Sequence, residues 1–209
     1  MANNKKIVSL PRAVALDLLN SIFVKKRTLD QAIFTCKTFD TLTLSDKSFA
    51  RLLTVTVIRR AGQIDSVIQC FLRTGMPSGA RDFKNILRLA CAEILFLGGK
   101  SHAAVDSAVT LVEAKKLPHY KGLANAVLRR LASEGKKKLK RFPVRLNYPN
   151  WLIDSWTTHY GLEKAEKIFE VCVQEPMLDI SVKSDHSYWA KKLDGRLLAS
   201  GSIRRKFSG

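Results

Sequence analysis

The chain has 209 residues, 46% of them hydrophobic, and its 36 Lys and Arg residues outnumber 18 Asp and Glu to give a formal net charge of +18. This length allows one packed core with appended structure but excludes two large domains. Repulsion among so many positive charges destabilises a compact fold unless a polyanion offsets it, which favours nucleic acid as the partner over an anionic membrane. No apolar stretch is long enough to span a bilayer, and the N-terminal residues do not form a secretory signal, so no membrane association is expected.

The four cysteines, Cys36, Cys70, Cys91 and Cys172, are widely spaced and include no C-x-x-C pair. They therefore predict neither a disulfide framework nor a zinc site. Cys91 and Cys172 lie in apolar runs, where a small buried side chain is expected. Unpaired thiols are typical of a reducing compartment, so the expected location is the cytoplasm.

Apolar residues recur three and four positions apart through the first 135 residues, which is the period of a helix with one buried face. About seven helices with short connections are predicted, and the fold class is all-α. The most apolar segment, residues 81–99, is expected at the centre of the bundle. The first predicted helix runs from Pro11 to about Lys26, and the second carries Leu29, Ile33 and Phe34. The third begins at Ser45 and Asp46, and the fourth follows a break near Gly62. The last two cover residues 102–116 and 121–135.

The character of the chain changes after Gly135. The run KKKLKR, Lys136 to Arg141, is either a solvated linker or part of a nucleic-acid surface, and both interpretations stay open. Two short helices are expected next, separated at Gly161 and stopped by Pro176. The alternating segment from Leu178 to Val182 predicts a strand, for which no partner long enough to build a sheet is expected, so mobility or makeshift packing is predicted there.

These features predict three parts. Residues 1–135 form a helical RNA-binding domain, residues 136–177 a basic linker with a helical segment, and residues 178–209 an incomplete α/β segment that includes a short helix around SYWAKKL.

The sequence offers no active site. Gly99-Lys100-Ser101 is similar to the end of a phosphate-binding loop, but Ile94 stands where that loop needs glycine, and no strand precedes it. The four histidines lack metal-ligand spacing. No glycine-rich strand-to-helix turn is present for a dinucleotide or adenosyl cofactor. We therefore expect no catalytic residue, no metal and no cofactor in this chain.

The basic residues are the feature of the sequence that indicates a function. Recognition of single-stranded RNA needs cations that neutralise phosphates, together with rings on which bases stack. Tyr120 lies between two lysines and either stacks on a base or packs over the helix junction. The predicted RNA-binding residues are Lys5, Lys6, Arg12, Lys25, Lys26, Arg27, Lys115, Lys116, Tyr120, Lys121, Arg129 and Arg130.

Three segments, KGLANAVLRRL, HAAVDSAVTLVEAKK and LRLACAEILFL, resemble the NusB fold, the helical RNA-binding domain of the transcription antitermination factor. The resemblance spans roughly Pro11 to Ser133. It implies a NusB-like bundle whose RNA surface lies at the start of the first helix and the last two helices. In that arrangement, Lys5, Lys6 and Arg12 would join the basic residues between Lys115 and Arg130 in one patch.

The resemblance continues past the bundle. The segments YPNWLIDSW, QEPMLDISVKS and GRLLASGSIRR resemble the region that follows the NusB-like domain in the RsmB/Sun family of ribosomal RNA (cytosine-C5) methyltransferases. That family continues into a methyltransferase domain with an S-adenosylmethionine loop and a nucleophilic cysteine. Neither is present here, so no catalytic residue is carried over.

Two functions follow from these resemblances. The first is the substrate-docking N-terminal region of a small-subunit ribosomal RNA 5-methylcytosine methyltransferase, with ribosomal RNA and a C-terminal methyltransferase domain as partners. The second is a free-standing NusB-type antitermination factor. The chain continues well beyond Ser133, with Trp151, Trp156 and a strand, and this favours the first.

Overall fold

The computed structural model describes residues 9–205, in which eleven α-helices, two short 3-10 helices and three short strands form. The chain divides into two compact units, residues 1–166 and 167–209. No helix of residues 9–205 is long and apolar enough to cross a membrane.

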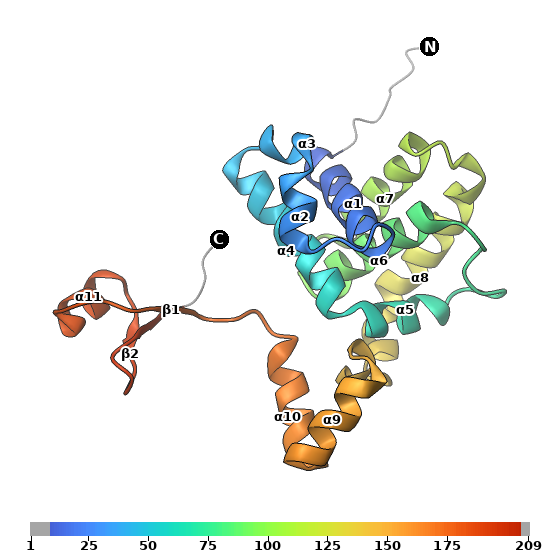
Figure 1. Cartoon of the computed structure of the whole chain (residues 1–209). Coiled ribbons are helices and arrows are strands. Elements are labelled where there is room, and N and C mark those ends of the chain that lie inside the picture. Colours follow the sequence, from blue (N-terminus) through green and yellow to red (C-terminus); the bar gives the residue numbers. More distant parts are fainter. Residues whose placement is uncertain (1–8, 206–209) are drawn as a thin grey trace. The chain divides into compact units, whose positions relative to one another are not determined.

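The first unit is a helical bundle, which confirms the predicted all-α class (Figure 1). Its helices are α1 (Leu10–Phe23), α2 (Leu29–Phe34), α3 (Lys37–Asp40), α4 (Leu44–Arg59), α5 (Ala61–Gln69), α6 (Arg81–Leu95), α7 (Ser101–Ala114), η1 (Pro118–Tyr120), α8 (Lys121–Leu139), η2 (Val144–Asn147) and α9 (Asn150–Tyr160). Seven of these α-helices, α1, α2 and α4 to α8, match the seven predicted for the bundle.

Helix α6 is the centre of the bundle and contacts α1, α4, α5, α7 and α8 (Figure 1). Eleven of its fifteen residues are buried, among them Phe83, Ile86 and Leu87. This confirms the central position predicted from apolar residues on most of its faces. Burial of the Cys91 thiol in α6 raises its pKa, because the thiolate would lose its hydration.

A second, smaller apolar cluster lies where α1 meets α2, α3 and α4. Thr28 begins α2 with a capping box, in which its hydroxyl accepts from the Gln31 amide and the Gln31 side chain accepts from the Thr28 amide. The buried residue of α2 is Ala32, whereas Phe34 is 89% exposed. Helix α3 is a single turn, too short for a periodic pattern to predict it.

The predicted break near Gly62 is present two residues earlier, at Arg60, which separates α4 from α5, and Gly62 itself lies in the first turn of α5. Helix α8 runs through Gly135 to Leu139, so the predicted domain end at residue 135 falls within a helix. Gly135 is buried where the Leu95 side chain approaches closely, and Leu139 packs against the core. Part of the KKKLKR run is therefore the last turn of a packed helix and not a linker.

The two predicted tail helices are present, and Gly161, with φ of 78°, separates them. Helix α10 (Leu162–Cys172) crosses the boundary between the units. Its buried positions, Ala165 and Phe169, lie four residues apart, and Val173 continues the same spacing. Cys172 is off this face and exposed, so its predicted burial is wrong.

The second unit contains β1 (Leu178–Ile180), α11 (His186–Lys192), β2 (Arg196–Leu197) and β3 (Ile203–Arg205). The strands form an antiparallel sheet in the order β1-β3-β2. The prediction that the first strand has no partner long enough to build a sheet is wrong, because β3 pairs with both β1 and β2. The three residues of β3 are too few to show an alternating pattern in the sequence. Ile203 in β3 is fully buried, and Arg204 pairs with Asp179 directly across the sheet.

Candidate nucleic-acid interface

The predicted basic residues fall into two groups, those held by acidic side chains and those without such partners. Lys5 and Lys6 lie outside the described residues. Arg12 belongs to the first group. Its guanidinium donates to both carboxylate oxygens of Glu93 and to the Ser9 hydroxyl, and it lies 5.0 Å from the centroid of the Phe49 ring. Glu93 is only 5% exposed, so this pair fastens α1 to α6.

Two of the predicted lysines are also paired. The Lys115 ammonium lies 2.8 Å from an Asp17 carboxylate oxygen, and Lys121 lies 2.5 Å from Glu113. A cation already paired with a carboxylate releases fewer counterions from RNA than an unpaired one, because the carboxylate repels phosphate. We therefore expect Lys115 and Lys121 to contribute less to the affinity for RNA than two unpaired lysines would.

Lys25, Lys26 and Lys116 are exposed, and no acidic side chain within residues 9–205 pairs with them. Lys26 and Lys116 have positive φ values of 58° and 57°, just after the ends of α1 and α7. Non-glycine residues adopt this left-handed conformation uncommonly, and here it lets the chain turn sharply away from each helix.

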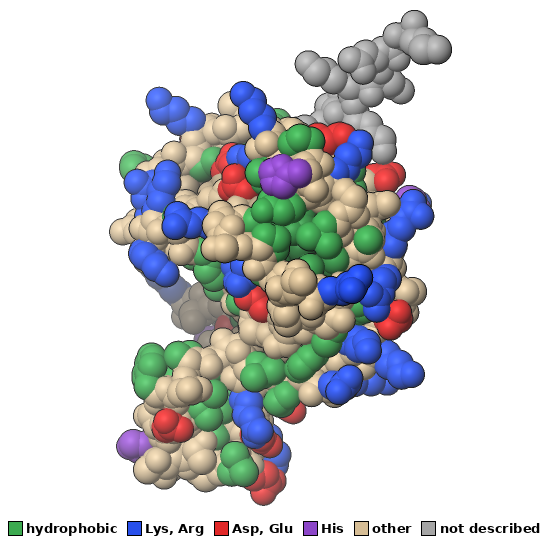
Figure 2. Space-filling model, turned by 90° about the vertical axis from the view of Figure 1, so that its right-hand side faces the viewer, with side chains coloured by type: hydrophobic (Ala, Val, Ile, Leu, Met, Phe, Trp, Pro, Cys, Tyr) green, Lys and Arg blue, Asp and Glu red, His purple; other side chains and the backbone are tan. Residues whose placement is uncertain are grey.

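The remaining predicted cations lie elsewhere in the bundle. Arg27 donates to the Thr35 hydroxyl, which turns it toward α2. Arg129 is exposed on α8 and donates to Asn125. Arg130 lies 5.3 Å from the centroid of the Phe71 ring, on the side of α8 that faces the end of α5. Figure 2 shows Lys and Arg side chains around one face of the molecule, with hydrophobic side chains grouped between them.

A cavity of about 330 Å³ brings two of the predicted basic segments together. Lys25, from the end of α1, and Leu117, which follows Lys116, both line it. Arg81, the first residue of α6, lines it as well and was not predicted. Its signal in the sequence is weak, because it is one basic residue after a Gly/Pro-rich loop. Lys25 and Arg81, which line this cavity, and Lys116, which directly precedes its lining residue Leu117, are called the junction cations below.

The surroundings of Tyr120 support the interpretation that its ring packs over the helix junction. Its ring stacks on Phe83, with centroids 4.5 Å apart and planes 20° apart, and Phe83 is fully buried. His119 lies against the same ring at 4.1 Å. Tyr120 is therefore part of the core surface, and its neighbour His119 is the exposed ring at this junction.

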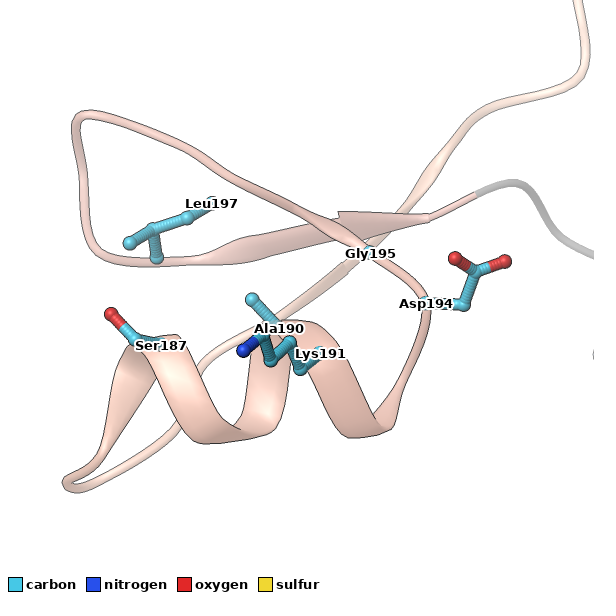
Figure 3. Close-up of a pocket in the computed structure, with 6 residues that line it drawn as sticks. All are labelled: Ser187, Ala190, Lys191, Asp194, Gly195 and Leu197. Carbon is cyan, nitrogen blue, oxygen red and sulfur yellow. The ribbon is translucent and has the colours of Figure 1, made fainter.

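The second unit has a shallow cavity of about 430 Å³ (Figure 3). Leu197 from β2 faces Ser187, Ala190 and Lys191 of α11, and Asp194 lies in the turn that follows the helix. One ammonium, one hydroxyl and one carboxylate without a common focus do not form a catalytic arrangement.

No group of three or more His, Cys, Asp or Glu side chains that could hold a metal ion occurs within residues 9–205. The strands of this part of the chain are two or three residues long and antiparallel, unlike the parallel sheet with a glycine-rich strand-to-helix turn that doubly wound folds use for dinucleotides.

Comparison with known proteins shows which sequences and folds the chain is similar to. The chain is 27% identical over 155 residues to ribosomal RNA small subunit methyltransferase B of Shigella boydii and of Escherichia fergusonii. These alignments cover 71% of the chain but only 36% of each relative.

Two solved structures share the fold. T. maritima NusB superposes with a TM-score of 0.54 at 22% identity, over 64% of this chain and 99% of that one. PH0851 superposes with a TM-score of 0.57 at 15% identity, over 97% of this chain and 50% of that one. Residues 9–133 match the NusB family. The chain therefore belongs to the NusB family.

Proposed function

We propose that this chain is an RNA-binding module that docks small-subunit ribosomal RNA for a cytosine-C5 methyltransferase. The main support for the proposal is that the fold brings the junction cations to one place. Lys25 and Arg81 line one cavity, and so does Leu117, the residue that follows Lys116. These cations come from three separate segments, and the net charge of +18 surrounds them with a positive field that attracts a polyanion.

The relatives support the choice of RNA. Their name describes a methyltransferase of small-subunit ribosomal RNA, and the aligned stretch is longer than the segment that matches the NusB family. A free-standing antitermination factor is the second candidate, since the T. maritima NusB chain is matched over 99% of its length. The α9–α10 region and the second unit lie beyond residues 9–133, the segment that matches the NusB family, and favour the first candidate.

In this proposal, methyl transfer and S-adenosylmethionine binding belong to another domain of the same enzyme, and the cytoplasm is where docking takes place. Residues 9–205 contribute affinity and orientation for the RNA. Incubation of this chain with S-adenosylmethionine and small-subunit ribosomal RNA should give no methylated product, and calorimetry should detect no cofactor binding. Cofactor binding at micromolar affinity would contradict this division of labour.

The direct test is binding of fluorescent RNA followed by anisotropy over a range of salt concentrations. Fragments of small-subunit ribosomal RNA should bind more tightly than transfer RNA of equal length, with affinity that falls steeply as salt rises. Equal affinity for both RNAs would contradict the ribosomal assignment. Absence of binding at low salt would contradict RNA binding itself.

A further inference from the structure

The cavity beside the junction cations has apolar walls and one fixed acceptor. Val24, Ala80 and Leu117 form apolar parts of its lining, and Asn20 and Asp82 supply its uncharged and acidic polar groups. Its volume of about 330 Å³ is ample for one planar heterocycle with part of its sugar. Lys25 and Arg81 are exposed at the same cavity and add positive charge.

A line of hydrogen bonds through the bundle holds the Asp82 carboxylate in place. Asn20 donates to Asp82 Oδ1 at 2.6 Å, and Asn85 donates to the Asn20 carbonyl oxygen at 2.8 Å. Arg88 donates to the Asn85 carbonyl oxygen at 3.0 Å and is itself fixed by two hydrogen bonds to Asp65. Asn85 is 2% exposed and Arg88 8%, so most of this line is buried.

The two ends of the line set its direction. Arg88 can only donate, so the amide of Asn85 turns its oxygen toward Arg88 and its NH₂ group toward Asn20. Asn20 accepts this bond with its oxygen and must offer its own NH₂ group to Asp82. Asp82 therefore accepts from Asn20 through Oδ1. Its second oxygen, Oδ2, receives no hydrogen bond from the described part of the chain.

Resting on the proposed RNA-binding function, we propose that this cavity takes a single unpaired base that carries an exocyclic amino group. The base lies between the apolar walls, its amino group donates to Asp82 Oδ2, and the adjoining phosphates lie near Lys25 and Arg81. A carboxylate accepts from the amino group of cytosine, and unpaired bases are the usual targets of sequence-specific RNA recognition. Uracil has a carbonyl oxygen in place of the amino group, and its one donor, the ring N3–H, lies between two carbonyl oxygens that the carboxylate repels, so uracil should bind more weakly.

The test uses fluorescent single-stranded oligoribonucleotides of equal length, oligo(C), oligo(A) and oligo(U), with the full chain. Binding of oligo(C) or oligo(A) should exceed that of oligo(U) by about tenfold. Asp82→Asn keeps an oxygen for Asn20 but presents an NH₂ group to the cavity, so the preference should shift toward oligo(U). Asp40→Asn, an exposed substitution on α3 with the same change in charge, should leave the ratio of affinities unchanged.

Each outcome has a separate meaning. Unchanged ratios in an Asp82→Asn variant that melts like the wild-type protein would overturn the base pocket, while RNA binding would still stand. Equal affinities of the wild-type chain for all three oligonucleotides would overturn it as well. Failure of the wild-type chain to bind any of them at low salt would overturn the proposed function instead.

Discussion

Gly62 in α5 lies directly against the backbone of Leu146, so closely that a Cβ atom at position 62 would stand 1.8 Å from the Leu146 carbonyl oxygen. Three hydrogen bonds of 2.9 Å surround this approach. The Gln63 amide donates to Asn147, the Gln63 side chain donates to the Phe142 carbonyl oxygen, and Asn147 donates to the Gln63 side chain. The segment after α8 is thus fastened to the bundle.

Gly62→Ala should detach this segment. Because the backbone of Leu146 cannot yield as a flexible side chain does, we expect a loss of about 1–3 kcal/mol in the free energy of unfolding. Urea denaturation measures this loss, and trypsin should cleave faster after Arg141 and Arg145. Gly122→Ala in α8 is the matched control, since no atom lies within 4 Å of its Cβ, and it should stabilise by about 0.5–1 kcal/mol. Equal stability of both variants would contradict the close approach.

Tyr120→Ala should lower stability and leave RNA affinity unchanged in the folded protein. The variant removes a ring that stacks on the buried Phe83, so we expect a loss of about 2–4 kcal/mol in the free energy of unfolding. Tyr120→Phe keeps the ring and should retain most of the stability. If Tyr120→Ala weakened RNA binding while its melting temperature stayed the same, the ring would be a stacking platform after all.

The junction cations should dominate the salt dependence of RNA binding. Replacing Lys25, Arg81 and Lys116 with Gln should reduce the slope of log K against log salt by about one unit for each lost phosphate contact. The matched control replaces Lys115 and Lys121 with Gln. Because these two lysines are paired with Asp17 and Glu113, their replacement should change the slope less.

The alternative RNA-binding element is the run from Lys136 to Arg141. Neutralising the exposed lysines Lys136, Lys137 and Lys140 should reduce affinity only slightly, because they lie beyond the junction on the last turn of α8 and just after it. If this variant abolished binding while the junction variant retained it, the RNA surface would lie at the end of α8.

Acid should weaken the bundle through Asp65. Burial by itself raises the pKa of this carboxyl, but hydrogen bonds and charge from Arg88 and Lys84 outweigh burial and hold the pKa below its ordinary value of 3.8. The stabilisation from ionised Asp65 is therefore fully present above pH 3.8 and is lost as the pH falls through the lower folded-state pKa. Asp65→Asn should be less stable than the wild-type protein at pH 7, and the difference should shrink near pH 2 in urea denaturation. A constant difference at both pH values would contradict the pairing.

The thiols should react in two classes. Cys70 and Cys172 are exposed and should be alkylated rapidly in the native protein. Cys91 is fully buried in α6 and its pKa is raised, so it should react only after unfolding. Mass spectrometry after a short pulse of iodoacetamide distinguishes the classes, and native labelling of Cys91 would show that α6 opens locally.

Helical periodicity predicted the bundle well because a buried face recurs at helical spacing, as in α5 and α8. It could not predict α3, which is one turn long, or β3, whose three residues become a strand only through pairing with β1 and β2. For the interface, the sequence indicated where cations occur but not which are paired. Arg12 and Glu93 lie 81 positions apart, and only the fold brings them together. Arg81 was missed for the same reason, since its partner in the cavity, Lys25, is on another helix.

The order of strands in the second unit has a consequence for the synthesis of the chain. The central strand β3 is the last of the three to be made, and both edge strands hydrogen-bond to it alone. A nascent chain that has emerged only as far as Gly201 therefore carries two strands with no surface on which to assemble. Since the buried Ile203 also belongs to β3, the sheet and its apolar centre can form only once β3 has been made.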